Sequence, residues 1–241
     1  MEKLRAELDD LVATLPNAEA FRASLDSLIS VYPFNEYEYI IAALFAADKL
    51  THDEYIELRD AYIARNMFLY IFEISAPRGF GEAWAQGHLK ELVPELQKPS
   101  KKLDLSYSGE YDFLLDGHIK IEVKASRAVD FDSDEPLYVK ALASDSAERF
   151  DMNFQQVKPG CCDVFVWIGV WRDVIRHWVL ASKEVSSNRY YSTGQHRGNV
   201  GEGQLHLKHD NVDEFSEYEA PSSDLTAAIR DAYKRQHETT M

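Results

Sequence analysis

A change in hydrophobic period near residue 103 constrains the fold of this chain more than any other feature. Before that point apolar residues recur every three or four positions, the period of an amphipathic helix, as in Leu4, Leu8, Leu11 and Leu15. After it, apolar residues alternate with polar or charged ones around Asp116-Gly117: Phe113, Leu115, Ile119, Ile121 and Val123. Strict alternation across such a turn indicates a β-hairpin.

The remaining elements are predicted from the same two periods and from residues that cap helices or form turns. Thr51 with Glu54 three residues later forms a capping-box pattern, which predicts a helix running to about Asn66. The other predicted helices cover residues 18–31, 36–48, 80–92 and 144–157, and two apolar strands cover 164–171 and 174–181. This order indicates an α/β or α+β fold, with helices flanking a mixed central sheet and a helical region at the N-terminus.

Charge divides the 241-residue chain into two expected regions. Residues 1–75 carry 6 basic and 14 acidic side chains, so we expect a helical packing layer and dimerisation element there rather than a helix-turn-helix DNA reader. We expect a catalytic core over residues 76–241. The formal net charge of −15 argues against a general nucleic-acid binder. Residues 151–200, however, carry 6 basic and 4 acidic side chains, and a local patch is what meets a phosphate backbone.

Compartment and redox state follow from what the sequence lacks. No apolar run reaches the roughly 18–20 residues that a membrane helix needs, and the N-terminus has no signal-peptide core. A cytoplasmic protein without a membrane partner is therefore expected. The adjacent Cys161 and Cys162 show no zinc-site spacing, so we expect two reduced thiols.

The hairpin carries the residues that suggest chemistry. Glu122 and Lys124 are two positions apart on a strand, so they point to one face while Val123 points to the other. A two-residue turn at Asp116-Gly117 would place Asp112 on the opposite face from Glu122. A three-residue loop or a bulge would place them together and would gather all the apolar residues on one face. We favour the second register, although such a loop usually has its Gly last and here His118 is last.

Two carboxylates can bind a hard divalent cation, and a neighbouring ammonium can stabilise negative charge on a phosphate. Asp112, nine intervening residues and Glu122-Val123-Lys124 resemble the PD-(D/E)xK nuclease superfamily, within it the type II restriction endonucleases. Tyr111 stands where the family name has Pro. The resemblance implies a restriction-endonuclease-like sheet, Mg²⁺ held by Asp112 and Glu122, and a catalytic Lys124. It also implies roles for Glu82, on the preceding helix, and for Gln155 or Gln156, on the following helix.

Residues 189–204 are rich in the side chains that read base edges, with glycines that allow close approach, so we expect a DNA-reading loop there. A flexible surface loop would have the same composition. The expected base-reading residues are Gln195, His196, Arg197, Asn199 and Gln204. The expected phosphate contacts are Arg127, Lys158, Arg172 and Arg176, the last two being equally compatible with a solvated strand end.

These observations predict a Mg²⁺-dependent type II restriction endonuclease, a homodimer that cuts double-stranded DNA at a short palindrome. A DNA methyltransferase acting on the same site is the expected partner. Three alternatives remain: a repair or junction-resolving nuclease of the same superfamily, a non-catalytic DNA-binding or regulatory protein, and a surface hairpin with salt-bridged charges.

Overall fold

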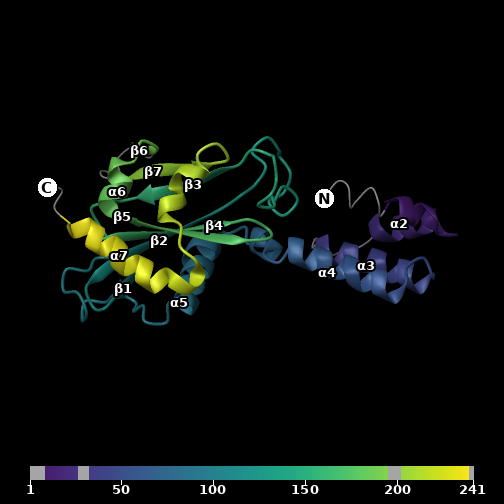
Figure 1. Ribbon diagram of the computed structural model, residues 1–241, viewed down its shortest axis with the longest axis horizontal. Helices are drawn as coiled ribbons and strands as arrows, with labels where there is room; N and C mark the ends of the chain where they lie inside the picture. Colours follow the sequence, from purple (N-terminus) through teal and green to yellow (C-terminus); the bar gives the residue numbers. More distant parts are fainter. Residues whose placement is uncertain (1–8, 27–32, 195–201, 239–241) are drawn as a thin grey trace.

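Two β-sheets and a set of helices form the main body of the molecule. The computed structural model describes residues 9–26, 33–194 and 202–238. The larger sheet has the order β1-β2-β4-β5, and the smaller has the order β3-β7-β6 (Figure 1). The larger sheet contains β1 (Phe113–Leu115), β2 (Ile119–Arg127), β4 (Val164–Val170) and β5 (Ile175–Ala181). The smaller contains β3 (Asp151–Val157), β6 (Tyr191–Thr193) and β7 (Gly203–Lys208). The mixed α/β, or α+β, class is as expected.

Strand β4 lies at the centre of the fold, and each of its residues is buried. It pairs in parallel with β2 and antiparallel with β5, which makes the larger sheet mixed. On one face of this sheet, Val164, Val166 and Ile168 share an apolar cluster with helices α5 (Gln86–Leu92) and α7 (Leu225–His237). On the other face, Phe165 and Trp167 share a cluster with the smaller sheet. The fold therefore has three layers: helices, the larger sheet and the smaller sheet.

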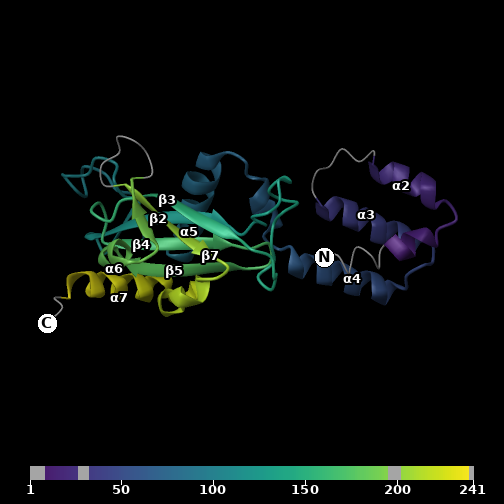
Figure 2. The ribbon, with the colours of Figure 1, turned by 90° about the horizontal axis from the view of Figure 1, so that it is seen from above.

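The N-terminal helices build a separate apolar cluster. It contains residues from α2 (Ala18–Asp26), α3 (Pro33–Ala46) and α4 (His52–Arg65), and these helices extend away from the sheets (Figure 2). The capping box is confirmed: Glu54 N donates to Thr51 Oγ1 at 3.2 Å, and Thr51 N donates to Glu54 Oε2 at 2.8 Å. The short helix η1 (Leu69–Glu73) already packs into the core of the sheets. The change from one core to the other occurs between Tyr62 and Leu69.

The predicted helix over 144–157 is wrong. Residues 144–150 have no helix, and β3 begins at Asp151. Met152 and Phe154 are buried at alternate positions, opposite Leu207 and Leu205 of β7. Because β7 lies about 50 residues further along the chain, the local sequence does not reveal this partner.

Several elements after residue 181 were not predicted. They are α6 (Ser182–Ser187), η3 (Val212–Tyr218), η4 (Ser222–Asp224), β6, β7 and α7. The predicted helix over 80–92 is present as a π-helical segment, η2 (Gly79–Ala85), followed directly by α5. Within the described parts of the chain, no helix has the length and apolar character needed to cross a membrane.

Candidate active site

The register of the β1–β2 hairpin brings the three expected catalytic residues to one face. Leu115 pairs with Ile119, so the loop has three residues, and Asp112 N donates to Ile121 O at 2.9 Å. Asp116 and Gly117 have φ values of 53° and 75°. Both lie in the left-handed region, which Asp and Gly tolerate better than most residues. The loop therefore adopts its positive φ values at its first two residues and needs no Gly at the third. The favoured register is confirmed.

Asp112 is held by a donor on each carboxylate oxygen. Val123 N donates to Oδ2 at 2.8 Å, and Gln86 Nε2 donates to Oδ1 at 2.5 Å. On the neighbouring strand, Lys124 Nζ lies 2.8 Å from Glu122 Oε1. The side chains of Glu122 and Lys124 are 17% and 18% exposed. Asp112, Glu122 and Lys124 therefore form one half-buried polar cluster on β1 and β2, which we call the carboxylate pair with its lysine.

Both carboxylates of the pair have raised pKa values. Burial raises the pKa of Glu122 to about 7; Lys124 opposes this shift, and the Asp112 charge adds to it. Burial also raises the pKa of Asp112, against the Val123 N–H and the charges of Lys124 and Lys98. For both carboxylates the desolvation that comes with burial outweighs the favourable contacts, so each pKa is raised. Such a pair gains stability from any added cation.

Gln86 was missed by the sequence analysis, although it anchors Asp112. Lys98 Nζ donates to Gln86 Oε1, and a lysine ammonium has no acceptor, so the amide must direct its NH₂ group at Asp112. The segment before β1 brings Lys98 close, because Gln97 and Leu114 exchange two backbone hydrogen bonds of 2.8 Å. Gln86 follows Glu82 by about one helical turn. The helix before β1 therefore does provide a side chain to the site, as predicted, but the residue is Gln86 and not Glu82.

The other expected catalytic positions lie at exposed places in the described part of the chain. Glu82 faces solvent with a side chain 68% exposed and lies 3.8 Å from Arg78 Nε. Gln155 and Gln156 are exposed on strand β3 at a bulge, where Gln156 has a φ of 55°. Glu82 is on a helix, as predicted, whereas Gln155 and Gln156 are on a strand, so their placement on a helix is wrong.

Two of the expected phosphate contacts make internal contacts instead, and a third is half-buried. Arg127 Nη1 donates to the carbonyls of Ile71 and Ile74 at 3.1 and 2.8 Å, and its guanidinium lies 4.1 Å from the Phe80 ring centroid. Arg176 makes two hydrogen bonds to Glu219, at 2.7 and 2.5 Å. Arg172 is half-buried, and burial lowers its pKa. Arg127 and Arg176 therefore hold elements together.

Lys158 is close enough to the carboxylate pair for the charge of Glu122 to affect its pKa. It lies 2.7 Å from Glu202 Oε1, and this hydrogen bond raises the Lys158 pKa, with a smaller contribution from the charge of Glu122. Gln204 is on β7, where its Oε1 accepts from Asn153 Nδ2 at 3.1 Å. Gln195, His196, Arg197 and Asn199 lie outside the described residues.

The chemistry of the carboxylate pair fits Mg²⁺. This ion is usually held by one or two protein carboxylates, with water and substrate phosphate as its other ligands. Asp112 and Glu122 supply two carboxylates whose raised pKa values a bound dication would reverse. No arrangement of three or more His, Cys, Asp or Glu side chains suited to a metal occurs within residues 9–26, 33–194 and 202–238.

Comparison with known proteins finds no matching family model and no curated protein with significant similarity.

Proposed function

We propose that the chain is a Mg²⁺-dependent endonuclease of double-stranded DNA, of the type II restriction kind and with a restriction-endonuclease-like core. The observation that carries this proposal is the convergence of Asp112, Glu122 and Lys124 on one face of the hairpin, where burial raises the pKa of both carboxylates. Salt-bridged surface charges would not be buried in this way, nor have raised pKa values.

Each residue has a physical role in this reaction. Asp112 and Glu122 would hold Mg²⁺, which lowers the pKa of a coordinated water and stabilises charge on the scissile phosphate. Lys124 presents its ammonium beside Glu122, where it can orient the attacking water and stabilise the negative charge that develops. Gln86 and the Val123 N–H keep the Asp112 carboxylate in one orientation.

Plasmid cleavage tests the proposal. We expect supercoiled plasmid to be cut with Mg²⁺ and left intact with EDTA. Asp112→Asn and Lys124→Ala should both abolish cutting, while a gel shift with Ca²⁺ in place of Mg²⁺ still shows DNA binding. Full cleavage by either variant would remove the proposal.

Lys120→Ala is the matched control for Lys124→Ala. Lys120 lies on the same face of β2, but it pairs with Asp104 at 2.8 Å rather than with the carboxylate pair. Its removal should leave cleavage close to the wild-type rate. Equal loss in both lysine variants would mean that a general charge effect, and not the position of Lys124, supports activity.

The products distinguish the kind of nuclease. Discrete bands from plasmid DNA support a restriction enzyme, whereas nicking confined to junctions or flaps supports a repair nuclease. A homodimer predicts twice the chain mass in solution. A cognate methyltransferase predicts that methylating the site blocks the cut.

A further inference from the structure

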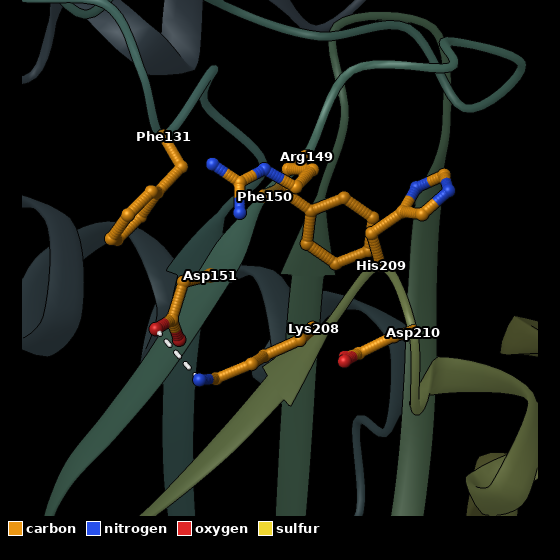
Figure 3. Close-up of a pocket in the computed structure, with 7 residues that line it drawn as sticks. All are labelled: Phe131, Arg149, Phe150, Asp151, Lys208, His209 and Asp210. Atoms are coloured by element: carbon orange, nitrogen blue, oxygen red, sulfur yellow. Dashed lines mark ion pairs between the residues drawn. The ribbon is translucent and has the colours of Figure 1, made fainter.

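A small cavity lies at the end of the smaller sheet, away from the carboxylate pair. It has a volume of about 180 Å³ and opens where the loop before β3 meets the end of β7 (Figure 3). The seven residues that line it are Phe131, Arg149, Phe150, Asp151, Lys208, His209 and Asp210. Aromatic rings and charges of both signs thus share one opening, which the proposed catalytic reaction does not use.

Phe131 presents an aromatic face to solvent from a fixed position. It is 62% exposed, yet its backbone N–H donates to Arg149 O at 2.9 Å. Behind it, buried Phe150 packs edge-on against Trp171 and His209, at 5.4 and 5.9 Å between ring centroids. An exposed ring on an anchored backbone is a stacking surface for a planar ligand.

The cations beside this ring are paired with carboxylates at positions that a ligand can reach from solvent. Arg149 Nη2 donates to both oxygens of Asp132, at 2.7 and 2.8 Å, and Nε donates at 3.2 Å, but the two side chains are 67% and 57% exposed, so water and a ligand can compete for both groups. Lys208 Nζ is 3.6 Å from Asp151 Oδ2, while the other oxygen of Asp151 lies 2.6 Å from His206 Nδ1. Both cations can therefore turn to a phosphate without stranding a buried charge.

We propose that this cavity binds a nucleotide, with its base stacked on Phe131 and its phosphate bound by Arg149 and Lys208. The Arg149 guanidinium lies 5.9 Å from the Phe131 ring centroid, so one ligand can reach both. The lining thus combines an aromatic ring that can stack on a base with cations that can bind a phosphate. The source is either a free nucleotide or an unstacked nucleotide of a DNA strand.

The position of the cavity makes it a second site. Strand β3 runs from Asp151, in the cavity wall, to Val157, next to Lys158. Seven residues of strand span about 20 Å, so a nucleotide held here is not the one whose phosphate meets the carboxylate pair. Asn153 and His206 face each other between the two ends. A bound strand would cross these polar side chains on its way to Lys158.

Binding in EDTA tests the inference without requiring cleavage. One arm titrates the full chain with deoxyadenosine monophosphate by calorimetry; the other titrates a labelled 12-base single strand by fluorescence anisotropy. Binding in the first arm only identifies a free nucleotide, and binding in the second only identifies a strand. Absence of binding in both arms overturns the inference and leaves the catalytic proposal intact.

Three variants locate the binding. Phe131→Ala should weaken it about tenfold through lost stacking. Arg149→Gln should weaken it and lower the salt dependence of strand binding by about one ion. Asp132→Asn should tighten it, because it removes the carboxylate that competes with the phosphate for Arg149.

Controls match these changes elsewhere on the surface. Tyr70→Ala removes another exposed aromatic ring, one that is 49% exposed. Arg59→Gln breaks another arginine–carboxylate pair, with Glu38 at 3.3 Å. Neither should alter affinity. Wild-type affinity in Phe131→Ala, or equal losses in Phe131→Ala and Tyr70→Ala, would overturn the site.

Discussion

Replacing Glu122 by glutamine isolates the energetic consequence of burying two carboxylates beside one lysine. Glu122 has a pKa of about 7 in the folded chain and, as an ordinary glutamate, about 4.5 when unfolded. A group whose folded pKa is raised stabilises the fold at low pH and loses that contribution as the pH rises through the folded value. The two pKa values correspond to about 3 kcal/mol, of which about 2.5 kcal/mol is lost between pH 5 and pH 8.

The free energy of unfolding of Glu122→Gln should therefore depend less on pH than that of the wild type. At pH 8 in EDTA the variant should be the more stable protein. The gain will fall below the full figure, because glutamine also gives up the ion pair with Lys124. Urea denaturation followed by tryptophan fluorescence measures this, since all four tryptophans lie between residues 84 and 178, in the body that contains the sheets.

Mg²⁺ adds a second readout to the same experiment. Bound to the carboxylate pair, it should stabilise the wild type at pH 8 and stabilise Glu122→Gln much less. Parallel pH dependence of the two proteins in EDTA would refute the electrostatic reasoning. Equal stabilisation of both by Mg²⁺ would refute the metal assignment alone.

Three further predictions follow from contacts around the candidate site. Gln86→Leu removes a donor from Asp112, so the cleavage rate should fall about 10- to 100-fold; a wild-type rate would mean that Asp112 needs no such support. Burial lowers the pKa of His177 to about 4, so the free energy of unfolding should fall by about 3 kcal/mol as the pH drops from about 6.5 to 4. In acid denaturation, His177→Gln should lack this pH dependence. Arg127→Met removes the donor to the Ile74 carbonyl and one of the two donors to the Ile71 carbonyl, so it should cost about 1–3 kcal/mol in urea denaturation, while DNA affinity per folded molecule stays unchanged. A loss of affinity at full stability would restore Arg127 as a phosphate contact.

The hairpin register could be predicted because its determinants lie close together in the sequence. Burying five apolar side chains on one face is worth several kcal/mol, more than the cost of an unusual loop. The loop sequence argues against this register, since its third residue is His118 and not Gly. The structure resolves the conflict by placing the left-handed conformations at Asp116 and Gly117, where Arg230 also bonds Asp116 at 2.8 and 3.0 Å.

The wrong helix over 144–157 shows where local pattern fails. Met152 and Phe154 are at positions that fit a strand, but the segment is short and its partner β7 follows a long insertion. Strand pairing is decided by contacts between distant residues, whereas helical hydrogen bonds close within four residues. For the same reason β6 and β7 were not predicted.

By itself, the sequence determined the mixed class of the fold, the capped helix after Thr51 and the grouping of Asp112, Glu122 and Lys124. Each of these depends on residues a few positions apart, within reach of one turn of helix or one hairpin. Only the tertiary structure decided which neighbours complete the site and which cations are already engaged. Gln86 reaches Asp112 across 26 residues, and Arg176 meets Glu219 across 43, so packing between elements, and not local spacing, brings each pair together.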